Sequence, residues 1–479
     1  MKILVLDIGT SGVRATVVRD DLTTLHDQHR ELLPDSPANG FVEFDARLLA
    51  DTTLRLASEA IAATGNVDGV AISDQRASAV VWDRDGIPVG PALGWQDLRT
   101  IGECFMAREH GLFLAPNQTA TKIQWLLNTY DPDRSRDLLA GTVDTWIAWN
   151  LSNGDAHITD ATNAGVTGLA TLSFHDWDAA VLDALQIPRR SMASIGPSSG
   201  MLGVASALEG SPPIVALLGD QQASLAGMAC VHEGDAKITF GTGGMLDINL
   251  GDRAPTQSRR NTNGTFPIAA WRIGNDTTWA LESIMLAAGT NVQWLRDDLG
   301  LIATADESHE IAQQCSDTGD VWYVPALMGL GTPMWDYGAR SALFGLTRGT
   351  GRPEIVRAVL EGIAHRGADL VDAAIADCGV AIEALRIDGG MSDNPTFVQA
   401  LANTTQRPVE ISPVREATTR GAALFGLLAL GHFASASEIA TTWQPRQRVE
   451  PNATTDRDRW LEAVRRSGQW IPALSSIDF

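Results

Sequence analysis

Apolar residues occur along the chain in short runs that predict buried strands, with longer segments of helical spacing between them. The clearest strand runs are residues 2–8, 69–72, 214–218 and 384–388. The clearest helical segments are residues 46–64, 122–127, 144–149, 353–377, 395–404 and 456–467. This mixture of strands and helices predicts an α/β fold.

One pattern occurs twice. Residues 2–16 and residues 237–247 each consist of an apolar run, a glycine-rich turn and a second run, so that Gly9-Thr10-Ser11-Gly12 corresponds to Gly241-Thr242-Gly243-Gly244. Glycine turns between two strands leave main-chain N–H groups bare enough to approach an anion closely. The repeat therefore predicts a duplicated domain with a phosphate held between its two halves.

An acidic corner follows the strand predicted at residues 214–218, where Gly219-Asp220-Gln221-Gln222 leads into a helix. Ligands of α/β proteins usually bind at the carboxyl ends of strands, so Asp220 is a candidate for chemistry. Asp is also among the best residues for capping a helix, and this reading stays open. A third glycine turn, Gly389-Gly390, lies between a strand and a helix and suits the ribose and base of a nucleotide, or is an ordinary turn.

A second polar group lies in the first half of the chain. Arg76 follows the strand at residues 69–72, and Trp95, Gln96 and Asp97 follow shortly after it. Hydrogen-bonding side chains beside a flat apolar ring are the residue types that hold a small polyhydroxy ligand. The alternative is a solvated loop with its tryptophan in the core. The polar segment 160–164 either lines the same cleft or is a simple turn.

Composition narrows the possible partners. The chain has 479 residues, enough for two domains with a full core each, and its net charge is −22. That charge argues against binding nucleic acid or an anionic membrane surface. It permits nucleotide binding, which backbone N–H groups and a divalent cation can carry locally. The only lysines are Lys2, Lys122 and Lys237.

Targeting and metal signals are weak. The four widely spaced cysteines predict reduced thiols in a cytosolic protein. We expect neither a signal peptide nor a membrane span. The chain has no G-x-x-x-x-G-K-[ST] motif and no G-x-G-x-x-G after a strand, which argues against a P-loop and a dinucleotide-dependent oxidoreductase. His26 and His29 lack a carboxylate cluster, so we expect no zinc site.

Several of these motifs match one family in order along the chain. They are Asp7-Ile8-Gly9-Thr10-Ser11-Gly12-Val13-Arg14, Gly94-Trp95-Gln96-Asp97-Leu98-Arg99-Thr100, Thr121-Lys122-Ile123-Gln124-Trp125, Gly141-Thr142-Val143-Asp144-Thr145-Trp146, Gly219-Asp220-Gln221-Gln222, Phe240-Gly241-Thr242-Gly243, residues 329–336 and Asp388-Gly389-Gly390. Over nearly its whole length the chain resembles the FGGY carbohydrate kinases, and among them the glycerol kinases. The resemblance implies two actin-like, ribonuclease H-like ATPase domains around an interdomain cleft. Residues 1–229 would carry the acceptor and the catalytic base, and residues 230–479 would bind ATP.

The resemblance also implies a role for each matching residue. Asp220 matches the catalytic base, and Asp7 matches the carboxylate associated with Mg²⁺. Thr10, Ser11 and Arg14 match phosphate-loop positions, and the nucleotide contacts are Gly241, Thr242, Gly389, Gly390 and Asn394. Arg76, Trp95, Gln221 and Asp220 itself match the acceptor side.

Three acceptor-side positions depart from glycerol kinases. Ala77 stands where they usually have Glu, Asn117 where they have Tyr, and Met245 where they have Phe. Losing a carboxylate, a phenol and a phenyl ring leaves a roomier pocket with two fewer polar contacts. Because buried hydrogen bonds set the rejection of ill-fitting substrates, we expect an acceptor larger than glycerol.

We therefore expect an ATP-dependent kinase that phosphorylates a hydroxyl of a small polyol or sugar in the cytoplasm, with ATP and Mg²⁺. The alternatives are glycerol kinase activity proper, a xylulose-type ketopentose kinase, and an actin-like ATPase without a sugar acceptor. Gln75-Arg76-Ala77 lacks the His expected after this Gln in xylulose kinases. The sequence leaves the oligomeric state open, with a homodimer or a homotetramer as the expectation.

Overall fold

The computed structural model describes residues 1–257 and 259–477. Up to residue 230 its strands are β1 (Lys2–Gly9), β2 (Gly12–Arg19), β3 (Thr24–Glu31), β4 (Glu43–Phe44), β5 (Gly69–Asp74), β6 (Val80–Asp83), β7 (Ala92–Leu93), β8 (Leu138–Gly141), β9 (Ile158–Asp160), β10 (Ser194–Gly196), β11 (Ser199–Val204) and β12 (Pro213–Gly219). The helices of this part are α1 (Ala46–Thr64), α2 (Ile101–Glu109), α3 (Ala120–Tyr130), α4 (Val143–Leu151), α5 (Ala161–Gly165), α6 (Ala179–Ala184) and α7 (Asp220–Gly227).

The rest of the chain repeats this alternation. Its strands are β13 (Ala236–Phe240), β14 (Gly244–Gly251), β15 (Phe266–Ile273), β16 (Asp276–Met285), β17 (Trp322–Val324), β18 (Ala342–Phe344), β19 (Leu385–Asp388), β20 (Val409–Ile411) and β21 (Gln447–Val449). Its helices are α8 (Gly289–Asp297), α9 (Glu307–Ala312), α10 (Arg352–Cys378), α11 (Pro395–Thr405), α12 (Ala417–Ala429), α13 (Arg457–Ser467) and α14 (Pro472–Ser475). Short 3₁₀ turns lie at Arg189–Ser191, Gly390–Asp393 and Ala436–Thr442.

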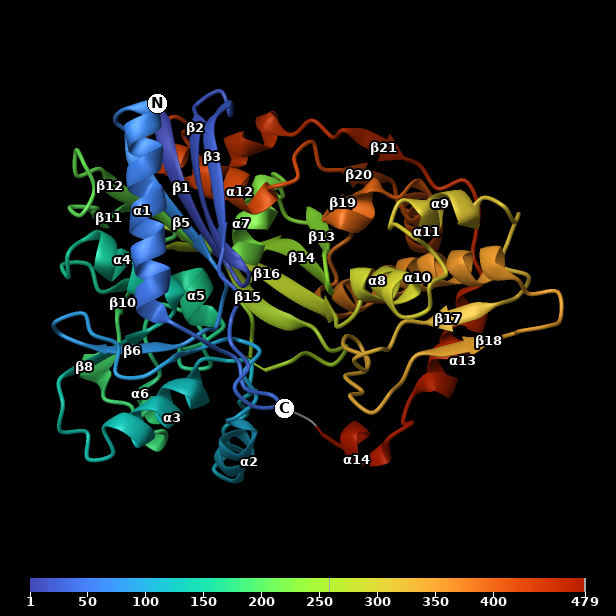
Figure 1. Ribbon diagram of the computed structural model, residues 1–479, viewed down its shortest axis with the longest axis horizontal. Helices are drawn as coiled ribbons and strands as arrows, with labels where there is room; N and C mark the ends of the chain where they lie inside the picture. The colour runs from blue at the N-terminus through green and yellow to red at the C-terminus, as the bar shows by residue number, and fades with distance from the viewer. Residues whose placement is uncertain (258, 478–479) are drawn as a thin grey trace.

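One large sheet runs through the molecule (Figure 1) and has thirteen strands among the described residues, in the order β21-β20-β19-β13-β14-β16-β15-β11-β12-β5-β1-β2-β3. In the first half β1 pairs antiparallel with β2 and parallel with β5. In the second half β13 pairs antiparallel with β14 and parallel with β19. The same pairing in both halves confirms the predicted duplication.

The two glycine hairpins differ by one residue in the turn. In the first, Gly9 pairs with Gly12, so only Thr10 and Ser11 form the turn. In the second, Phe240 pairs with Gly244, and residues 241–243 form a longer turn. The predicted correspondence of the glycines therefore holds at the level of the hairpin, with one extra loop residue in the second.

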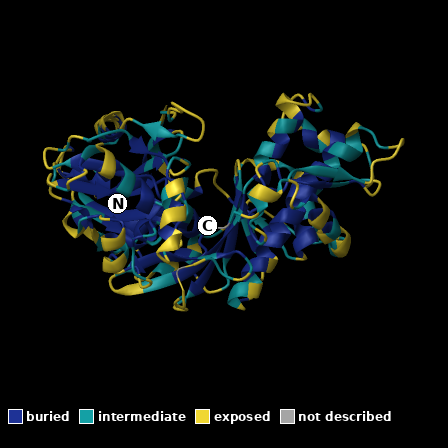
Figure 2. Cartoon of the chain, turned by 90° about the horizontal axis from the view of Figure 1, so that it is seen from below, coloured by how far each residue is buried: buried dark blue, intermediate teal, exposed yellow. Residues whose placement is uncertain are grey.

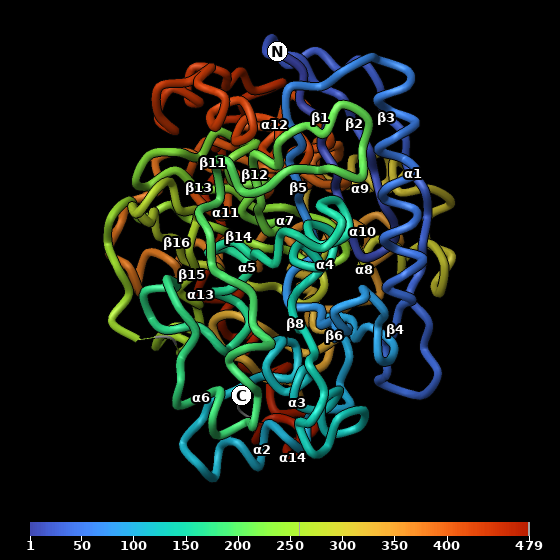
Figure 3. Tube along the Cα trace, turned by 90° about the vertical axis from the view of Figure 1, so that its left-hand side faces the viewer, coloured from blue at the N-terminus to red at the C-terminus, as the bar shows by residue number. Residues whose placement is uncertain are grey.

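The halves are joined at two levels. In the sheet, β11 of the first half and β15 of the second meet at one residue pair, Ser199 with Ile273. Beside the sheet, α12 packs on α7 and also on β1, β5 and β12, although it comes late in the chain (Figure 3 shows α12 next to β1). A Cβ at Gly421 would lie 1.8 Å from the carbonyl oxygen of Ala223, so the α7–α12 contact requires glycine.

Each half has its own apolar core. One cluster fills the second half around β13, β14 and α10, and others cover the two faces of the first half's sheet. Figure 2 shows buried residues in the interior of both halves and exposed residues on their outer loops and helices. Trp146 and Trp149 are buried, as predicted from their spacing. Among the described residues, no helix is both long and apolar enough to cross a bilayer.

Most predicted elements are confirmed, but the structure also contains several elements that the sequence did not predict. The helix expected at residues 353–377 is α10, which ends at the left-handed Gly379 as predicted. The polar segment 160–164 is not a simple turn, because Asp160 caps the short helix α5 through the N–H groups of Thr162 and Asn163. The strands β15 and β16 and the helix α12 had no sequence counterpart.

Candidate active site

Asp220 is the first residue of α7, directly after β12. The N-cap is Gly219, and the Asp220 side chain makes no capping bond to a described residue; it accepts a hydrogen bond of 2.8 Å from the N–H of Gln221. The capping reading is therefore wrong. The Asp220 side chain keeps 33% of its surface exposed. Burial of the site raises the pKa of Asp220 although the charge of Arg76 opposes the shift.

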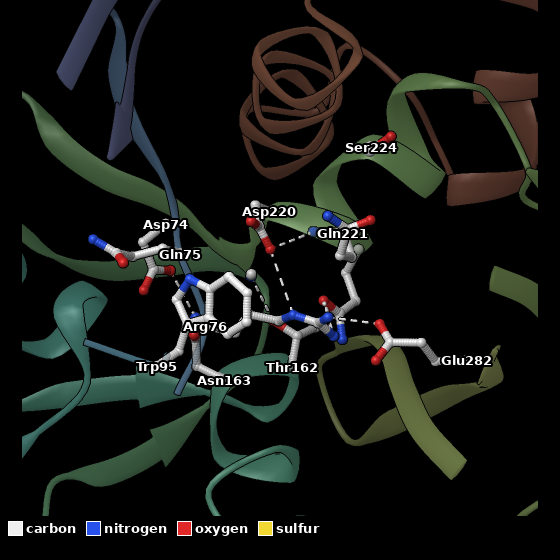
Figure 4. Close-up of polar contacts among 12 residues, drawn as sticks. Asp74, Gln75, Arg76, Trp95, Thr162, Asn163, Asp220, Gln221, Ser224 and Glu282 are labelled. Carbon is white, nitrogen blue, oxygen red and sulfur yellow. Dashed lines mark hydrogen bonds and ion pairs between the residues drawn. The ribbon is translucent and has the colours of Figure 1, made fainter. Parts of the chain in front are cut away.

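Arg76 lies between two carboxylates, as Figure 4 shows. It follows the end of β5, and its Nη2 is 2.6 Å from Glu282 Oε2 while its Nε is 3.4 Å from Asp220 Oδ1. A third group, Gln222 Oε1, accepts from Nη1 at 3.4 Å. Burial disfavours the charged guanidinium, but Glu282 and Asp220 together raise the pKa of Arg76 above its usual range. Arg76 therefore stays protonated between these acids.

Gln221 is held from the second half. Its Oε1 accepts a hydrogen bond of 2.8 Å from Lys237 Nζ, and Lys237 is also 2.9 Å from Asp247 Oδ2. The side chains of Lys237 and Asp247 are completely buried. Because the oxygen of the Gln221 amide is occupied in this way, its NH₂ group is the part left to donate to a ligand.

Trp95 lies in the loop after β7 and touches the first glycine hairpin. Its Nε1 donates to Thr10 Oγ1 at 3.0 Å, and its backbone N–H donates to Ser78 Oγ at 3.1 Å. The buried Lys122 donates to the carbonyl of Gln118 at 2.9 Å and to that of Trp95 at 3.4 Å. Burial lowers the pKa of Lys122 to about 7. These bonds fix the loop that carries the indole.

Asp7 lies near the end of β1, on the strand face shared with α12. Its Oδ2 accepts a bond of 3.4 Å from Thr419 Oγ1. Burial, together with the negative charges of Asp220 and Glu416, raises the pKa of Asp7 to about 7. Arg14, opposite Asp7 on β2, is paired with Asp27 at 2.7 Å and with Glu416 at 3.1 Å. Asp7 is thus a carboxylate in a region of excess negative charge.

The predicted nucleotide residues surround the second hairpin. Gly241 and Thr242 are exposed, and a Cβ at Gly241 would meet nothing within 4 Å. A Cβ at Gly389, whose φ is 84°, would lie 2.4 Å from the carbonyl oxygen of Phe240, so glycine is required there to bring this turn against the hairpin. Asn394 caps α11 through the N–H of Phe397 and donates to Ser308 Oγ at 2.8 Å.

The remaining predicted residues are less closely tied to this cluster. Asn117 lies exposed in the turn before α3 and makes no side-chain hydrogen bond to another described residue. Ser11 is exposed at the tip of the first hairpin. Met245 is half-buried on β14, two residues before Asp247 and therefore on the same face of the sheet. It faces the side on which Lys237 and Gln221 meet.

Glu282 and the polar layer of Asp74, Thr162 and Asn163 beneath the site were not predicted from the sequence. Asn163 Nδ2 donates to Asp74 Oδ1 at 2.9 Å, and Thr162 Oγ1 accepts from the N–H of Gly219 at 2.8 Å, directly before Asp220. The helix α5 therefore supports the corner that carries Asp220. A lone Glu within the apolar run of β16 was the available signal for Glu282, because an unpaired acid is rarely buried.

Comparisons with known proteins agree with this geometry. The model of the N-terminal domain of the FGGY family of carbohydrate kinases matches residues 2–227, and the model of its C-terminal domain matches residues 236–430. Glycerol kinase 2 of Thermotoga maritima is 37% identical and the alignment covers 98% of this chain and 99% of that protein. Glycerol kinase of Halorhodospira halophila is 39% identical over 98% of this chain and 97% of that protein.

A solved structure extends the similarity to the fold. The crystal structure of Plasmodium falciparum glycerol kinase with ADP superposes with a TM-score of 0.90 at 27% identity, covering 97% of this chain and 98% of that chain. Both halves and the cleft between them are thus those of the two-domain, actin-like ATPase fold. The chain belongs to the FGGY family of carbohydrate kinases, which are phosphotransferases with an alcohol group as acceptor.

Proposed function

We propose that the chain transfers the γ-phosphoryl group of ATP to a hydroxyl of a small polyol or sugar, with Asp220 as the catalytic base. The observation that carries the proposal is the position of Asp220. It is a partly exposed carboxylate at the end of β12, next to Arg76 and in the electrostatic field of Asp7. An alcohol is a weak nucleophile, so its attack needs a proton acceptor within reach. The raised pKa of Asp220 suits that role.

The phosphates are proposed to lie between the two glycine hairpins. Thr10, Ser11 and Arg14 would contact them from the first hairpin, and Gly241 and Thr242 from the second. The open space at Gly241 supports this placement, because a side chain there would occupy the approach of a ligand to the backbone N–H groups. Gly389, Gly390 and Asn394 are proposed to border the nucleoside. Arg14 would have to exchange Asp27 or Glu416 for a phosphate oxygen.

Asp7 fits a role in holding Mg²⁺ with the nucleotide. Among the described residues no group of three His, Cys, Asp or Glu side chains is arranged for a metal. Mg²⁺ in kinases is usually bound through one or two carboxylates plus phosphate oxygens and water, so a lone carboxylate is a suitable donor. The excess negative charge that raises the pKa of Asp7 also favours a cation beside it. When bound, the ion would neutralise charge on the phosphates.

The acceptor is proposed to be larger than glycerol. Arg76 and the NH₂ group of Gln221 would donate to its hydroxyls, Asp220 would accept from the reacting one, and Trp95 would pack against its carbon skeleton. Ala77 has φ of 65° and a methyl side chain that cannot hydrogen-bond to a ligand hydroxyl. With Asn117 exposed and Met245 flexible, the pocket offers few fixed contacts that would match a three-carbon polyol.

Release of ADP measured with a panel of three- to five-carbon polyols and ketoses tests this function. We expect ADP release that depends on an added acceptor, with a four- or five-carbon polyol or sugar giving a higher kcat/KM than glycerol. The highest kcat/KM with glycerol would identify a glycerol kinase, the activity that the names of the relatives favour. The highest value with xylulose would confirm an acceptor larger than glycerol and identify it as a ketopentose. ADP release that needs no acceptor would favour an actin-like ATPase.

The proposal also covers the compartment and the oligomeric state of the protein. The four cysteines are all free, which supports a reducing compartment such as the cytoplasm. Assembly into a homodimer or a homotetramer remains a prediction, and light scattering of the purified protein would test it.

A further inference from the structure

Arg76 is bound more tightly to Glu282 than to the catalytic carboxylate. The distance from Arg76 to Glu282 is 2.6 Å, whereas the nearest approach to Asp220 is 3.4 Å. The side chains of Arg76 and Glu282 are 10% and 7% exposed, so water screens their attraction little. Figure 4 shows Glu282 on the opposite side of the guanidinium from Trp95 and Asp74.

The pair joins the two halves of the molecule. Arg76 follows β5 in the first half, and Glu282 lies on β16 in the second, 206 residues later in the chain. On β16, Glu282 is directly opposite Asp247 of β14, which is itself paired with Lys237. Asp247 is an anion, and Lys237 is already bound to Asp247 and Gln221. Neither residue could therefore take the place of Arg76 beside Glu282.

We propose that Glu282 is a positioning residue for the acceptor, one that acts by holding Arg76 in the orientation that binds an acceptor hydroxyl. This inference rests on the proposed function. Without Glu282 the guanidinium loses its strongest partner and is free to turn away from the orientation in which it meets an acceptor hydroxyl.

The physical consequence is a loss of acceptor binding. Arg76 donates to the acceptor before and during the reaction, so losing its orientation removes binding that the ground state and the transition state share. That kind of loss raises KM with a smaller change in kcat. Glu282 itself is placed behind Arg76, so its effect depends on the presence of Arg76.

A double-mutant cycle tests this dependence. We expect Glu282→Gln to raise the KM of the best acceptor about tenfold, with kcat changed about threefold or less and the KM of ATP unchanged. In the Arg76→Gln background the same substitution should change the acceptor KM by less than about twofold, because nothing remains to be positioned. Glu282→Asp, which keeps the charge, should lie between the wild type and Glu282→Gln, and serves in its place if that variant does not fold.

Glu410 provides a matched control. It is also a strand glutamate, 12% exposed and 2.6 Å from an arginine, but it lies on β20 near the far edge of the sheet. Glu410→Gln should leave the acceptor KM unchanged. An unchanged KM in Glu282→Gln, or an equal KM increase with and without Arg76, would overturn the inference. Wild-type protein without acceptor-dependent ADP release would instead overturn the proposed function.

Discussion

Asp220 combines two properties that a proton acceptor needs, an accessible oxygen and a pKa raised by burial. Arg76 lies beside it without covering it, because the guanidinium is directed mainly at Glu282. Only two of the lysines, Lys122 and Lys237, are fully buried, in a chain whose basic residues are otherwise almost all arginine. Both bind several acceptors at once, which a compact ammonium can do within a small space.

Replacing Asp220 with Asn should remove turnover without unfolding the protein. An amide keeps the size of the side chain and can still accept from the N–H of Gln221, but it cannot take a proton from an alcohol. We expect kcat to fall about 10²- to 10⁴-fold, the usual contribution of general base catalysis. Single-turnover kinetics would measure this, and calorimetry would show that ATP still binds.

Asp235→Asn is the control for that substitution, because Asp235 is a partly buried carboxylate directly before β13, at the opposite end of the strand from the glycine turn. It should leave kcat unchanged. A kcat of Asp220→Asn within tenfold of wild type would show that another group accepts the proton.

The sequence predicted those site residues that follow neighbouring parallel strands. β5 and β12 pair in parallel, so the residues after their carboxyl ends, Arg76 and Asp220, had to lie close together. Glu282 could not be predicted in this way. It reaches the site from an antiparallel strand of the other half, and its position depends on how the halves meet.

At the scale of elements, α4, α5 and β5 bring three acids together beneath the site. Asp74 Oδ2 accepts from the N–H of Asp144 at 3.1 Å, Thr159 Oγ1 donates to Asp144 Oδ2 at 2.6 Å, and Asp160 caps α5. Burial, with the nearby charge of Asp160, raises the pKa of Asp144 to about 6. Burial and Asp144 raise the pKa of Asp74 as well. Protonation therefore suits this cluster.

The stability that Asp144 contributes to the fold should decrease as the pH rises through its folded-state pKa. With a pKa of about 6 in the folded state against the ordinary value of 3.8, Asp144 keeps its proton where the unfolded chain has lost it. Its stabilising contribution is full below the unfolded value and is lost as the pH rises through about 6, at most about 3 kcal/mol. Asp144→Asn should reduce the decline between pH 4 and pH 6, measured by urea unfolding.

Asp85, which lies on an exposed turn, provides the comparison for that measurement. Asp85→Asn should leave the pH dependence of the unfolding free energy as in the wild type. Parallel curves for Asp144→Asn and the wild type would show that Asp144 is already ionised in the folded state at pH 4.

The helix α10 was predictable from its start and stop signals, and the helix α12, which lacks them, was not. The helix α10 combines a proline in its first turn, a spaced apolar face and a glycine just past its end, so it was visible in the sequence. The helix α12 is apolar nearly all round, because it lies between α7 and the strands of the first half. Such a run has no periodicity that separates helix from strand.

At the scale of the whole molecule, duplication was readable from the two hairpins, but the way the halves interlock was not. The sheet is continuous through one residue pair, and close contact of α7 with α12 at Gly421 holds the halves together beside it. Neither feature leaves a pattern in the sequence, because each depends on residues far apart in the chain. The excess of acidic residues, in contrast, can be counted directly in the sequence.

A net charge of −22 should slow the encounter with ATP, which is itself an anion. Salt screens this repulsion, since the Debye length falls from about 30 Å at 0.01 M to about 8 Å at 0.15 M. We therefore expect kcat/KM for ATP to rise about threefold or more over that range, while kcat and the KM of an uncharged polyol stay constant. The polyol is the internal control, because it carries no charge for the protein to repel. A fall of kcat/KM with salt would mean that Arg14 attracts the phosphates more strongly than the remaining surface repels them, so that the local field of the cleft outweighs the net charge.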